Sequence, residues 1–286
     1  MDFGKLKLSG VKLYEENGKI YAEINQAGIE SRYSVPTFKF APPAKGILCD
    51  LDGTTVKSEE FWIYLMEKTV AALKRDPNFG FAQEDIPFVS GYTTLAHLEY
   101  CINKFGIKTD IKEANKTYHR IAEEELKAIL DGRGNINAFK PREGLKDFLT
   151  EVKGRKIKIA LVTSGLSYKA IPEIVSVFRI LNMGDPLDFY DAIITGGTRK
   201  IKGQFGTLGE IAAKPHPWVY AEVGAAISGD DKRGVVTLED SAAGLISSLT
   251  AGYPVIGFKD GNILKSNAEK LCSSMVETFD EVLKII

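Results

Sequence analysis

The chain has little cysteine and no long apolar run. Only three cysteines occur among 286 residues, Cys49, Cys101 and Cys272, and they lie too far apart to form a metal-binding motif. This usage predicts reduced, packed thiols in a cytoplasmic protein. No apolar stretch approaches the roughly 18 residues that a membrane helix needs, and residues 1–5 lack the apolar core of a signal peptide. We therefore expect no membrane partner.

The chain also carries almost no net charge. The 37 basic and 38 acidic residues leave a formal net charge of -1. Proteins that bind nucleic acid usually present a basic surface, so this balance predicts no nucleic-acid partner. With 44% hydrophobic and 26% charged residues, the composition is typical of a globular chain of one or two domains.

Residues 1–44 look separate from the rest of the chain. Residues 11–14 and 19–24 alternate between apolar and polar, and Asn17-Gly18 lies between them. This pattern predicts a β-hairpin. Pro42-Pro43 then marks a boundary. Nothing in this N-terminal β extension suggests chemistry. It could cover a sheet edge or contribute to a subunit interface, so both a monomer and a homodimer stay open.

From residue 45 the pattern becomes that of an α/β protein. Short apolar runs without clean alternation are typical of strands buried on both faces of a parallel sheet, and helical stretches separate most of them. The runs expected to form the sheet are 47–49, 157–162, 192–194, 235–238 and 254–258. We therefore expect a Rossmann-like three-layer core around a central parallel sheet.

One block, residues 57–140, has helical signals but no obvious strand. Ser58 is expected to cap its first helix, and three apolar stripes at helical spacing are expected to pack in a core. The stripes are Phe61, Trp62, Leu65, Met66, Val70 and Leu73; Leu95, Leu98, Ile102 and Phe105; and Tyr118, Ile121, Ala122, Leu126 and Ile129. The block therefore predicts an inserted all-α cap domain, with the α/β core formed by residues 45–56 and 141–286. The two linkers could hinge the cap over the strand ends.

Two carboxylates follow the first strand of the predicted core. The apolar run Gly46-Ile47-Leu48-Cys49 leads directly into Asp50-Leu51-Asp52-Gly53-Thr54-Thr55. Side chains two apart on a strand share a face, so Asp50 and Asp52 can point toward one small target. One carboxylate suits nucleophilic attack, the other suits proton transfer, and together they attract a divalent cation. A simple Asp-Gly hairpin turn is disfavoured because the next segment indicates a helix.

Three further strand ends carry groups suited to the same chemistry. Thr163-Ser164-Gly165 offers hydroxyls and backbone N–H groups ahead of a helix, a combination that binds phosphate oxygens. Lys214-Pro215-His216-Pro217 supplies a positive charge, and Glu239-Asp240-Ser241 supplies two more carboxylates for a hard cation. Each motif alone is common at helix starts and on surfaces. Ligands of open α/β sheets bind beyond the carboxyl ends of the strands. Because all the motifs are expected at these ends, they favour a common site.

Together the motifs resemble the haloacid dehalogenase superfamily of phosphotransferases. The matching positions, in motif order, are Asp50-Leu51-Asp52-Gly53-Thr54, Thr163, Lys214 and Glu239-Asp240. The stretches 214–220 and 238–244 resemble the β-phosphoglucomutase and phosphoglycolate phosphatase branch. That branch carries a helical cap after the first motif, where residues 57–140 lie. The resemblance spans residues 45–286 and omits the N-terminal extension.

The resemblance implies a phosphatase that acts on a small-molecule phosphate ester, such as a sugar phosphate or phosphoglycolate. By this resemblance, Asp50 is the nucleophile that forms an aspartyl-phosphate intermediate. Asp52 protonates the leaving oxygen and then takes a proton from the water that cleaves the intermediate. Thr163 holds phosphate oxygens, and Lys214 offsets negative charge.

The resemblance also implies a Mg²⁺ site and a specificity loop. The expected metal ligands are Asp50, the backbone carbonyl of Asp52, Asp240, and Glu239 either directly or through water. The expected substrate-binding residues are Ser164 and Gly165 in the core, and Tyr92, Thr93, Thr94 and His97 after the Gly91 turn of the cap. A cap that closes over the site suits small metabolites better than phosphoproteins.

Other functions stay open. The resembling phosphomutases carry a cap arginine for a second phosphate and a histidine on the first cap helix. Here residues 89–94 hold no arginine and Trp62 takes the comparable helix position, which favours hydrolysis. A dehalogenase does not keep the second aspartate, and a phospho-receiver module is shorter and lacks the helical insertion. A non-catalytic binding protein is disfavoured by four intact motifs. The long link 197–213 could be a flap or an interface loop.

Overall fold

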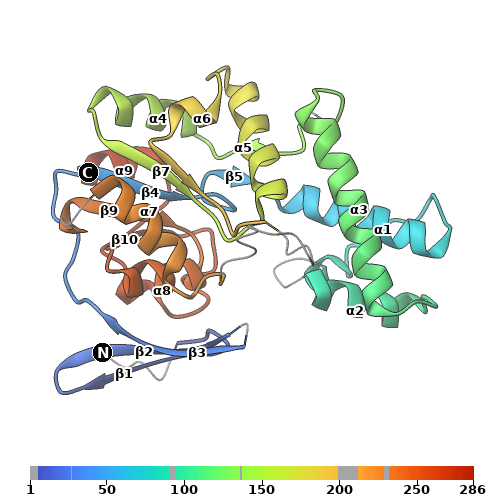
Figure 1. Ribbon diagram of the computed structural model, residues 1–286, viewed down its shortest axis with the longest axis horizontal. Helices are drawn as coiled ribbons and strands as arrows, with labels where there is room; N and C mark the ends of the chain where they lie inside the picture. The colour runs from blue at the N-terminus through green and yellow to red at the C-terminus, as the bar shows by residue number, and fades with distance from the viewer. Residues whose placement is uncertain (1–5, 27, 90–93, 136, 199–211, 229–231) are drawn as a thin grey trace, which may run out of the picture.

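The computed structural model describes residues 6–26, 28–89, 94–135, 137–198, 212–228 and 232–286. Figure 1 shows an α/β core, a helical part at one end of it, and a small β-sheet beneath the core. No helix in these ranges is long and apolar enough to cross a membrane. The three cysteines are buried and free, as predicted for packed thiols. Most of the predicted link 197–213 lies outside the described residues.

The core is built on a six-stranded sheet in which every neighbouring pair of strands is parallel. In sheet order the strands are β11 (Ser274–Val276), β10 (Val255–Phe258), β9 (Val235–Glu239), β4 (Gly46–Asp50), β7 (Lys158–Val162) and β8 (Ala192–Ile194). The predicted α/β class with a central parallel sheet is confirmed. Strand β11 was not predicted because it is only three residues long and begins with a serine.

The sheet register brings the strand ends together. All residues of β4 and β9 are buried, as expected for central strands of a parallel sheet. Asp50 of β4 is paired with Val162 of β7, and Cys49 of β4 is paired with Leu238 of β9. The residues that follow Val162 and Leu238 therefore emerge at the same edge of the sheet as Asp50. This edge holds all the motifs that the sequence singles out.

Helices cover both faces of the sheet. On one face lie α4 (Leu145–Gly154), α5 (Ser167–Leu181), α6 (Pro186–Phe189) and α9 (Phe279–Ile285), and on the other lie α7 (Trp218–Ser228) and α8 (Ala242–Ala251). Short 3-10 helices are η2 (Ile86–Phe88), η3 (Lys232–Gly234) and η4 (Glu269–Leu271). The first face packs around Phe148, Ile174 and Phe279. This is the three-layer arrangement that the apolar runs predict.

The helical part consists of α1 (Glu59–Lys74), α2 (Thr94–Phe105) and α3 (Ile111–Leu130). Two short strands, β5 (Val56–Lys57) and β6 (Lys140–Pro141), pair antiparallel where the chain leaves the core and returns to it. The apolar stripes of α1 and α3 pack in the core cluster as predicted. The inclusion of Leu95 was wrong: its residue is 49% exposed, and the buried stripe of α2 begins one turn later at Leu98. The domain boundaries stay a prediction.

The prediction for Ser58 was also wrong. Its backbone lies at the start of α1, but its side chain makes no capping hydrogen bond. Instead, Ser58 Oγ donates to Asp52 Oδ1 at 2.9 Å. A capping serine accepts from a backbone N–H and has an extended backbone, whereas Ser58 has φ -109 and ψ -9. Ser58 therefore belongs to the surroundings of Asp52.

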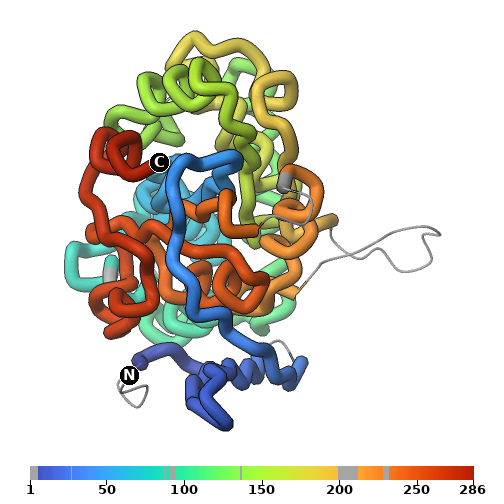
Figure 2. The backbone as a smooth tube through the Cα atoms, turned by 90° about the vertical axis from the view of Figure 1, so that its left-hand side faces the viewer, coloured from blue at the N-terminus to red at the C-terminus, as the bar shows by residue number. Residues whose placement is uncertain are grey.

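The N-terminal sheet contains the predicted hairpin and one more strand. Strands β1 (Val11–Glu16), β2 (Lys19–Gln26) and β3 (Ile29–Val35) form an antiparallel sheet in that order. Asn17 and Gly18 both have positive φ, as their hairpin turn requires. Strand β3 was not predicted because the residues at its centre are polar. The sheet packs against α8, with Val35 and Ile24 in one cluster with Leu249, and both views place it there (Figures 1 and 2).

Candidate active site

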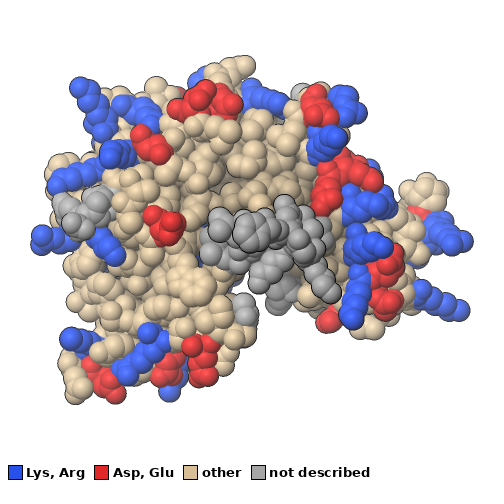
Figure 3. All heavy atoms as spheres, in the orientation of Figure 1, with Lys and Arg blue, Asp and Glu red and all other residues tan. Residues whose placement is uncertain are grey.

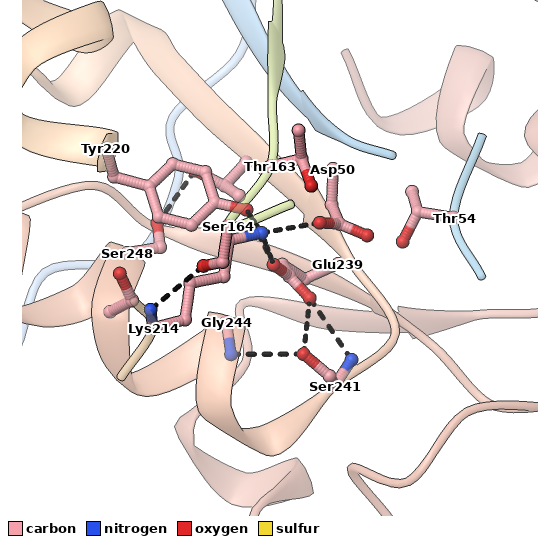
Figure 4. Close-up of polar contacts among 12 residues, drawn as sticks. Asp50, Thr54, Thr163, Ser164, Lys214, Tyr220, Glu239, Ser241, Gly244 and Ser248 are labelled. Carbon is pink, nitrogen blue, oxygen red and sulfur yellow. Dashed lines mark hydrogen bonds and ion pairs between the residues drawn. The ribbon is translucent and has the colours of Figure 1, made fainter. Parts of the chain in front are cut away.

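Four motifs from different parts of the chain meet at the carboxyl edge of the sheet (Figure 4). Asp50 ends β4, Thr163 follows β7, and Glu239 ends β9. Lys214 reaches them from the segment before α7. Carboxylate oxygens of Asp50, Glu239 and Asp240 all lie within 4.8 Å of one another. The structure therefore brings the predicted carboxylates and the predicted lysine into one cluster.

Lys214 lies inside this cluster, where its side chain is only 8% exposed. Its Nζ donates to Asp50 Oδ1 at 2.5 Å, to Glu239 Oε1 at 2.7 Å and to the Tyr220 hydroxyl at 3.1 Å. Burial lowers the pKa of the Lys214 ammonium, but the charges of Asp50 and Glu239 and its hydrogen bonds to them outweigh burial and raise the pKa. The lysine is therefore a permanent positive charge beside Asp50.

The carboxylates outnumber the positive charge that faces them. Burial, followed by the charge of Glu239, raises the pKa of Asp50 against the opposing effect of Lys214. Burial and the charge of Glu239 likewise raise the pKa of Asp240 to about 7. Three carboxylates around one lysine favour a further cation, and carboxylate oxygens are the donors that hard divalent cations prefer. The donor set therefore fits a divalent metal.

Glu239 has a second role that the motif does not reveal. Its Oε1 accepts from Lys214 and, at 2.6 Å, from the Tyr220 hydroxyl. Its Oε2 accepts from the backbone N–H and the hydroxyl of Ser241, at 3.1 and 2.9 Å. With both oxygens bound, Glu239 fixes the position of the Lys214 ammonium. Tyr220 was not predicted as a site residue, since a tyrosine in a helix is usually a packing residue.

Two glycines allow the carboxylates to approach so closely. A Cβ at Gly244 would lie 1.7 Å from Glu239 Oε1, and a Cβ at Gly53 would lie 2.3 Å from Asp240 Oδ2. Gly53 also has φ +84, which side chains rarely adopt. The Gly53 turn is held by Arg142, whose guanidinium donates to the carbonyls of Gly53 and Thr54 at 2.6 and 3.0 Å. Sequence reasoning missed Arg142, which lies just after the predicted cap block 57–140.

Asp52 occupies a different environment from Asp50. Asp50 is buried, whereas Asp52 is exposed and lines the cavity between core and cap. Asp52 Oδ1 accepts from Ser58, and Oδ2 accepts from Thr163 Oγ1 at 3.4 Å. Thr163 Oγ1 in turn accepts from the Gly165 N–H at 2.8 Å. Asp52 is thus oriented by two hydroxyls and faces the space where a substrate would enter.

Glu173 on α5 is a buried acid that sequence reasoning also missed. It is 1% exposed, and its Oε2 has no hydrogen-bond partner among the described residues. Burial, the charge of Asp52 and a hydrogen bond with Asp52 raise the pKa of Glu173 well above its ordinary value. A signal was present in the sequence, because Glu173 is an acid among the apolar residues Ala170, Ile174 and Val177. Glu173 therefore lies beside Asp52 and forms a hydrogen bond with it.

The cavity beside Asp52 has a volume of about 950 Å³ and lies between the core and the cap helices. Gly165, Thr94 and His97, three of the predicted substrate-binding residues, line it. Ser164 does not line it, since its Oγ accepts from the backbone N–H of Lys214 at 2.9 Å. Tyr92 and Thr93 lie outside the described residues. The substrate contacts predicted for all six residues stay predictions.

The molecular surface carries charge of both signs. In the view of Figure 3, lysines and arginines alternate with acidic residues over the core, the cap and the N-terminal sheet. This pattern agrees with the near-zero net charge. It gives no face of one sign in that view that would suit nucleic acid.

A family model described as haloacid dehalogenase-like hydrolase matches residues 47–258. Among solved structures, a predicted β-phosphoglucomutase from Thermotoga maritima is 21% identical with a TM-score of 0.59, covering 84% of this chain and 98% of that one. A predicted phosphoglycolate phosphatase from Haemophilus somnus is 18% identical with a TM-score of 0.59, covering 85% and 97%. CbbY from Rhodobacter sphaeroides, in complex with phosphate, is 18% identical with a TM-score of 0.56, covering 84% and 96%. At these identities the likeness shows the fold.

Proposed function

The chain belongs to the haloacid dehalogenase-like hydrolase family, as its motifs predict, and from this we propose a Mg²⁺-dependent phosphatase of small phosphorylated metabolites. The family supports phosphoryl-transfer hydrolysis in general. The observation that carries the narrower proposal is the buried Asp50 beside Lys214, with Asp240 next to it and a cavity in front of Asp52. An exposed acid beside a buried one suits a reaction with one nucleophile and one proton carrier.

In the proposed reaction, Asp50 attacks the phosphorus and displaces the ester oxygen. Asp52 donates a proton to that oxygen as it leaves, which gives a free alcohol and an aspartyl-phosphate. Asp52 then takes a proton from water, which attacks the phosphorus and releases inorganic phosphate and Asp50. Lys214 offsets the negative charge that builds up between carboxylate and phosphate. Thr163 and neighbouring backbone N–H groups hold phosphate oxygens.

The proposed ligands of Mg²⁺ are Asp50, Asp240, the backbone carbonyl of Asp52, and Glu239 directly or through water. When bound, the ion supplies positive charge that allows two anions to approach each other. The clustered carboxylate oxygens, which exceed the charge of Lys214, support this assignment. The cluster contains oxygen donors only, which favours Mg²⁺ over softer metals.

Metal binding is expected to weaken as the pH falls. Because the pKa of Asp240 is raised to about 7, a proton occupies this ligand below neutral pH and competes with the ion. The apparent Mg²⁺ dissociation constant should therefore rise about tenfold between about pH 8 and about pH 6. Calorimetric titration at several pH values measures it, with Asp240→Asn as the control that loses the pH dependence. A constant affinity across this range would remove Asp240 from the metal site.

Asp52→Asn is expected to slow the reaction of esters with poor leaving groups much more than that of esters with good ones. An alkyl phosphate needs a proton on the departing oxygen, so kcat should fall by about 10²- to 10⁴-fold. A nitrophenyl phosphate departs without that proton, so its first step should be affected far less. Pre-steady-state release of the alcohol or the nitrophenol, which reports on the first step alone, measures the difference. Equal losses on the two esters would show that Asp52 does not act as the acid.

The proposed function is tested by phosphate release from a panel of small phosphomonoesters with Mg²⁺ or with EDTA. Turnover that depends on the metal supports the phosphatase, and the rank order of the esters gives the substrate class. Phosphate release from none of them contradicts it. A bisphosphate-dependent isomerisation assay then tests the phosphomutase alternative.

A further inference from the structure

Lys169 places a second positive charge in the cavity, apart from Lys214. It lies in the first turn of α5, directly after the Thr163 motif, and it lines the cavity together with Asp52. The residue is half-buried, so its ammonium is accessible from the cavity. It faces the cap, where its ammonium contacts Trp62 and Tyr118.

Two aromatic residues of the cap hold the Lys169 side chain in place. Its Nζ lies 4.8 Å from the ring centroid of Trp62 on α1 and 5.0 Å from that of Tyr118 on α3. It also donates to the Tyr118 hydroxyl at 3.4 Å. Cation–π contacts position an ammonium without neutralising its charge. The lysine is therefore ordered and still positively charged.

The other lysines around the cavity provide a comparison. Lys57 pairs with Asp260 and Lys140 pairs with Glu60, each at 2.7 Å, so a carboxylate neutralises each charge. For Lys169 no ion pair occurs within the described residues. Lys265, which also lines the cavity, likewise has no ion pair among the described residues, and no aromatic contact orders it there. Among the described lysines of the cavity, Lys169 combines an ordered ammonium with the absence of an ion pair. The acid one turn further along α5, Glu173, interacts with its charge, but burial raises the pKa of that carboxyl.

We propose that Lys169 binds a second anionic group, a carboxylate or a phosphate, on the leaving group of the substrate. This inference rests on the proposed phosphatase function and narrows its substrate class to phosphorylated acids and bisphosphates. The phosphate that reacts lies at Asp50, and the second anion lies at the interface of α5 with α1 and α3. Because Trp62 and Tyr118 belong to the cap, the same contact selects substrates that bridge core and cap.

The test compares three esters that share a two-carbon leaving group. They are 2-hydroxyethyl phosphate, carboxymethyl phosphate and ethane-1,2-diol bisphosphate, which end in a hydroxyl, a carboxylate and a phosphate. Wild-type protein should show the higher kcat/KM for at least one anionic ester, and the preferred ester identifies the anion. Lys169→Met should lower kcat/KM for that ester by roughly 10- to 100-fold, as the loss of a charged hydrogen bond predicts. The hydroxyl ester should change less than about threefold, and Lys169→Arg should restore part of the loss.

Lys265→Met is the matched control, since it removes a lysine from the same cavity and should leave all three esters within about threefold of wild type. If Lys169→Met lowers kcat/KM equally for all three esters, Lys169 only holds the core and the cap together, and the proposal is overturned. The phosphatase itself would still stand in that case, because the hydroxyl ester reports on it alone.

If no ester is hydrolysed, binding measurements test the proposed subsite instead. Calorimetry with 3-phosphonopropionate and propylphosphonate compares two phosphonates that differ in one carboxylate. Wild-type protein should bind the carboxylate compound more tightly, and Lys169→Met should abolish the difference. Equal affinities in wild type, or a preference that survives Lys169→Met, overturn the subsite. Failure of the phosphatase and failure of the subsite are thus separate results.

Discussion

Asp50→Asn is expected to abolish phosphate release, with a fall in kcat of more than about 10⁴-fold, since loss of a nucleophile in a cooperating catalytic unit costs about 10⁶-fold elsewhere. The amide keeps the shape of the carboxylate but is a poor nucleophile and a poor metal ligand. Phosphate release from the best ester of the panel, with equal Mg²⁺ for both proteins, measures the effect. Normal turnover by the purified variant would contradict the assignment of the nucleophile.

The same variant should stay folded. Asp50 is buried beside Glu239, and both carboxylates share the charge of Lys214. Removal of one carboxylate leaves the Lys214–Glu239 pair intact and removes a repulsion. Thermal unfolding of the metal-free variant should therefore occur at the same temperature as that of wild type, or higher. A lower unfolding temperature would mean that lost activity reports lost structure.

Lys214→Met is expected to lower both activity and stability. The ammonium neutralises two buried carboxylates, and removal of one partner of a buried ion pair typically costs about 3–5 kcal/mol of unfolding free energy. Turnover should fall by at least about 10²-fold, because the charge that offsets phosphate and carboxylate is lost. Urea unfolding of the metal-free protein and phosphate release measure the two effects. Unchanged KM and kcat would remove Lys214 from the site.

A double variant separates these two effects. In Lys214→Met/Glu239→Gln, the carboxylate that Lys214 neutralises is replaced by a neutral amide, so much of the lost stability should return. Activity should not return, because the Lys214 ammonium no longer faces Asp50. Coupling of less than about 0.5 kcal/mol between the two substitutions would show that the 2.7 Å contact contributes little to folding.

The sequence predicted the strand ends well because they combine two independent signals. An apolar run marks each buried strand, and polar residues at its end mark the site, so Asp50, Thr163 and Glu239 were placed at one edge before the structure was known. The connections between strands were harder. Ser58 has the sequence pattern of a helix cap, yet its hydroxyl donates to Asp52 and accepts no capping N–H, because its backbone is helical and not extended.

The residues that sequence reasoning missed act through contacts between distant segments. Tyr220 and Arg142 lie in ordinary helix and linker contexts, and only the folded chain brings them to Glu239 and to the Gly53 turn. Glu173 is an acid on an apolar helix face, a weak local signal that gains meaning when Asp52 lies beside it. Leu95 matched the helical spacing, but periodicity does not reveal at which turn a helix begins to pack.

The N-terminal sheet has a consequence for synthesis on the ribosome. The Tyr33 hydroxyl lies 3.2 Å from Nδ1 of His216, which is encoded 183 residues later. At about 5–20 residues per second, roughly 10 to 40 s pass before that partner is translated. During this interval the apolar face of the sheet, which includes Leu13 and Ile24, has no α8 to cover it. Until α8 has been synthesised, the emerging chain therefore exposes an apolar surface that chaperones can bind.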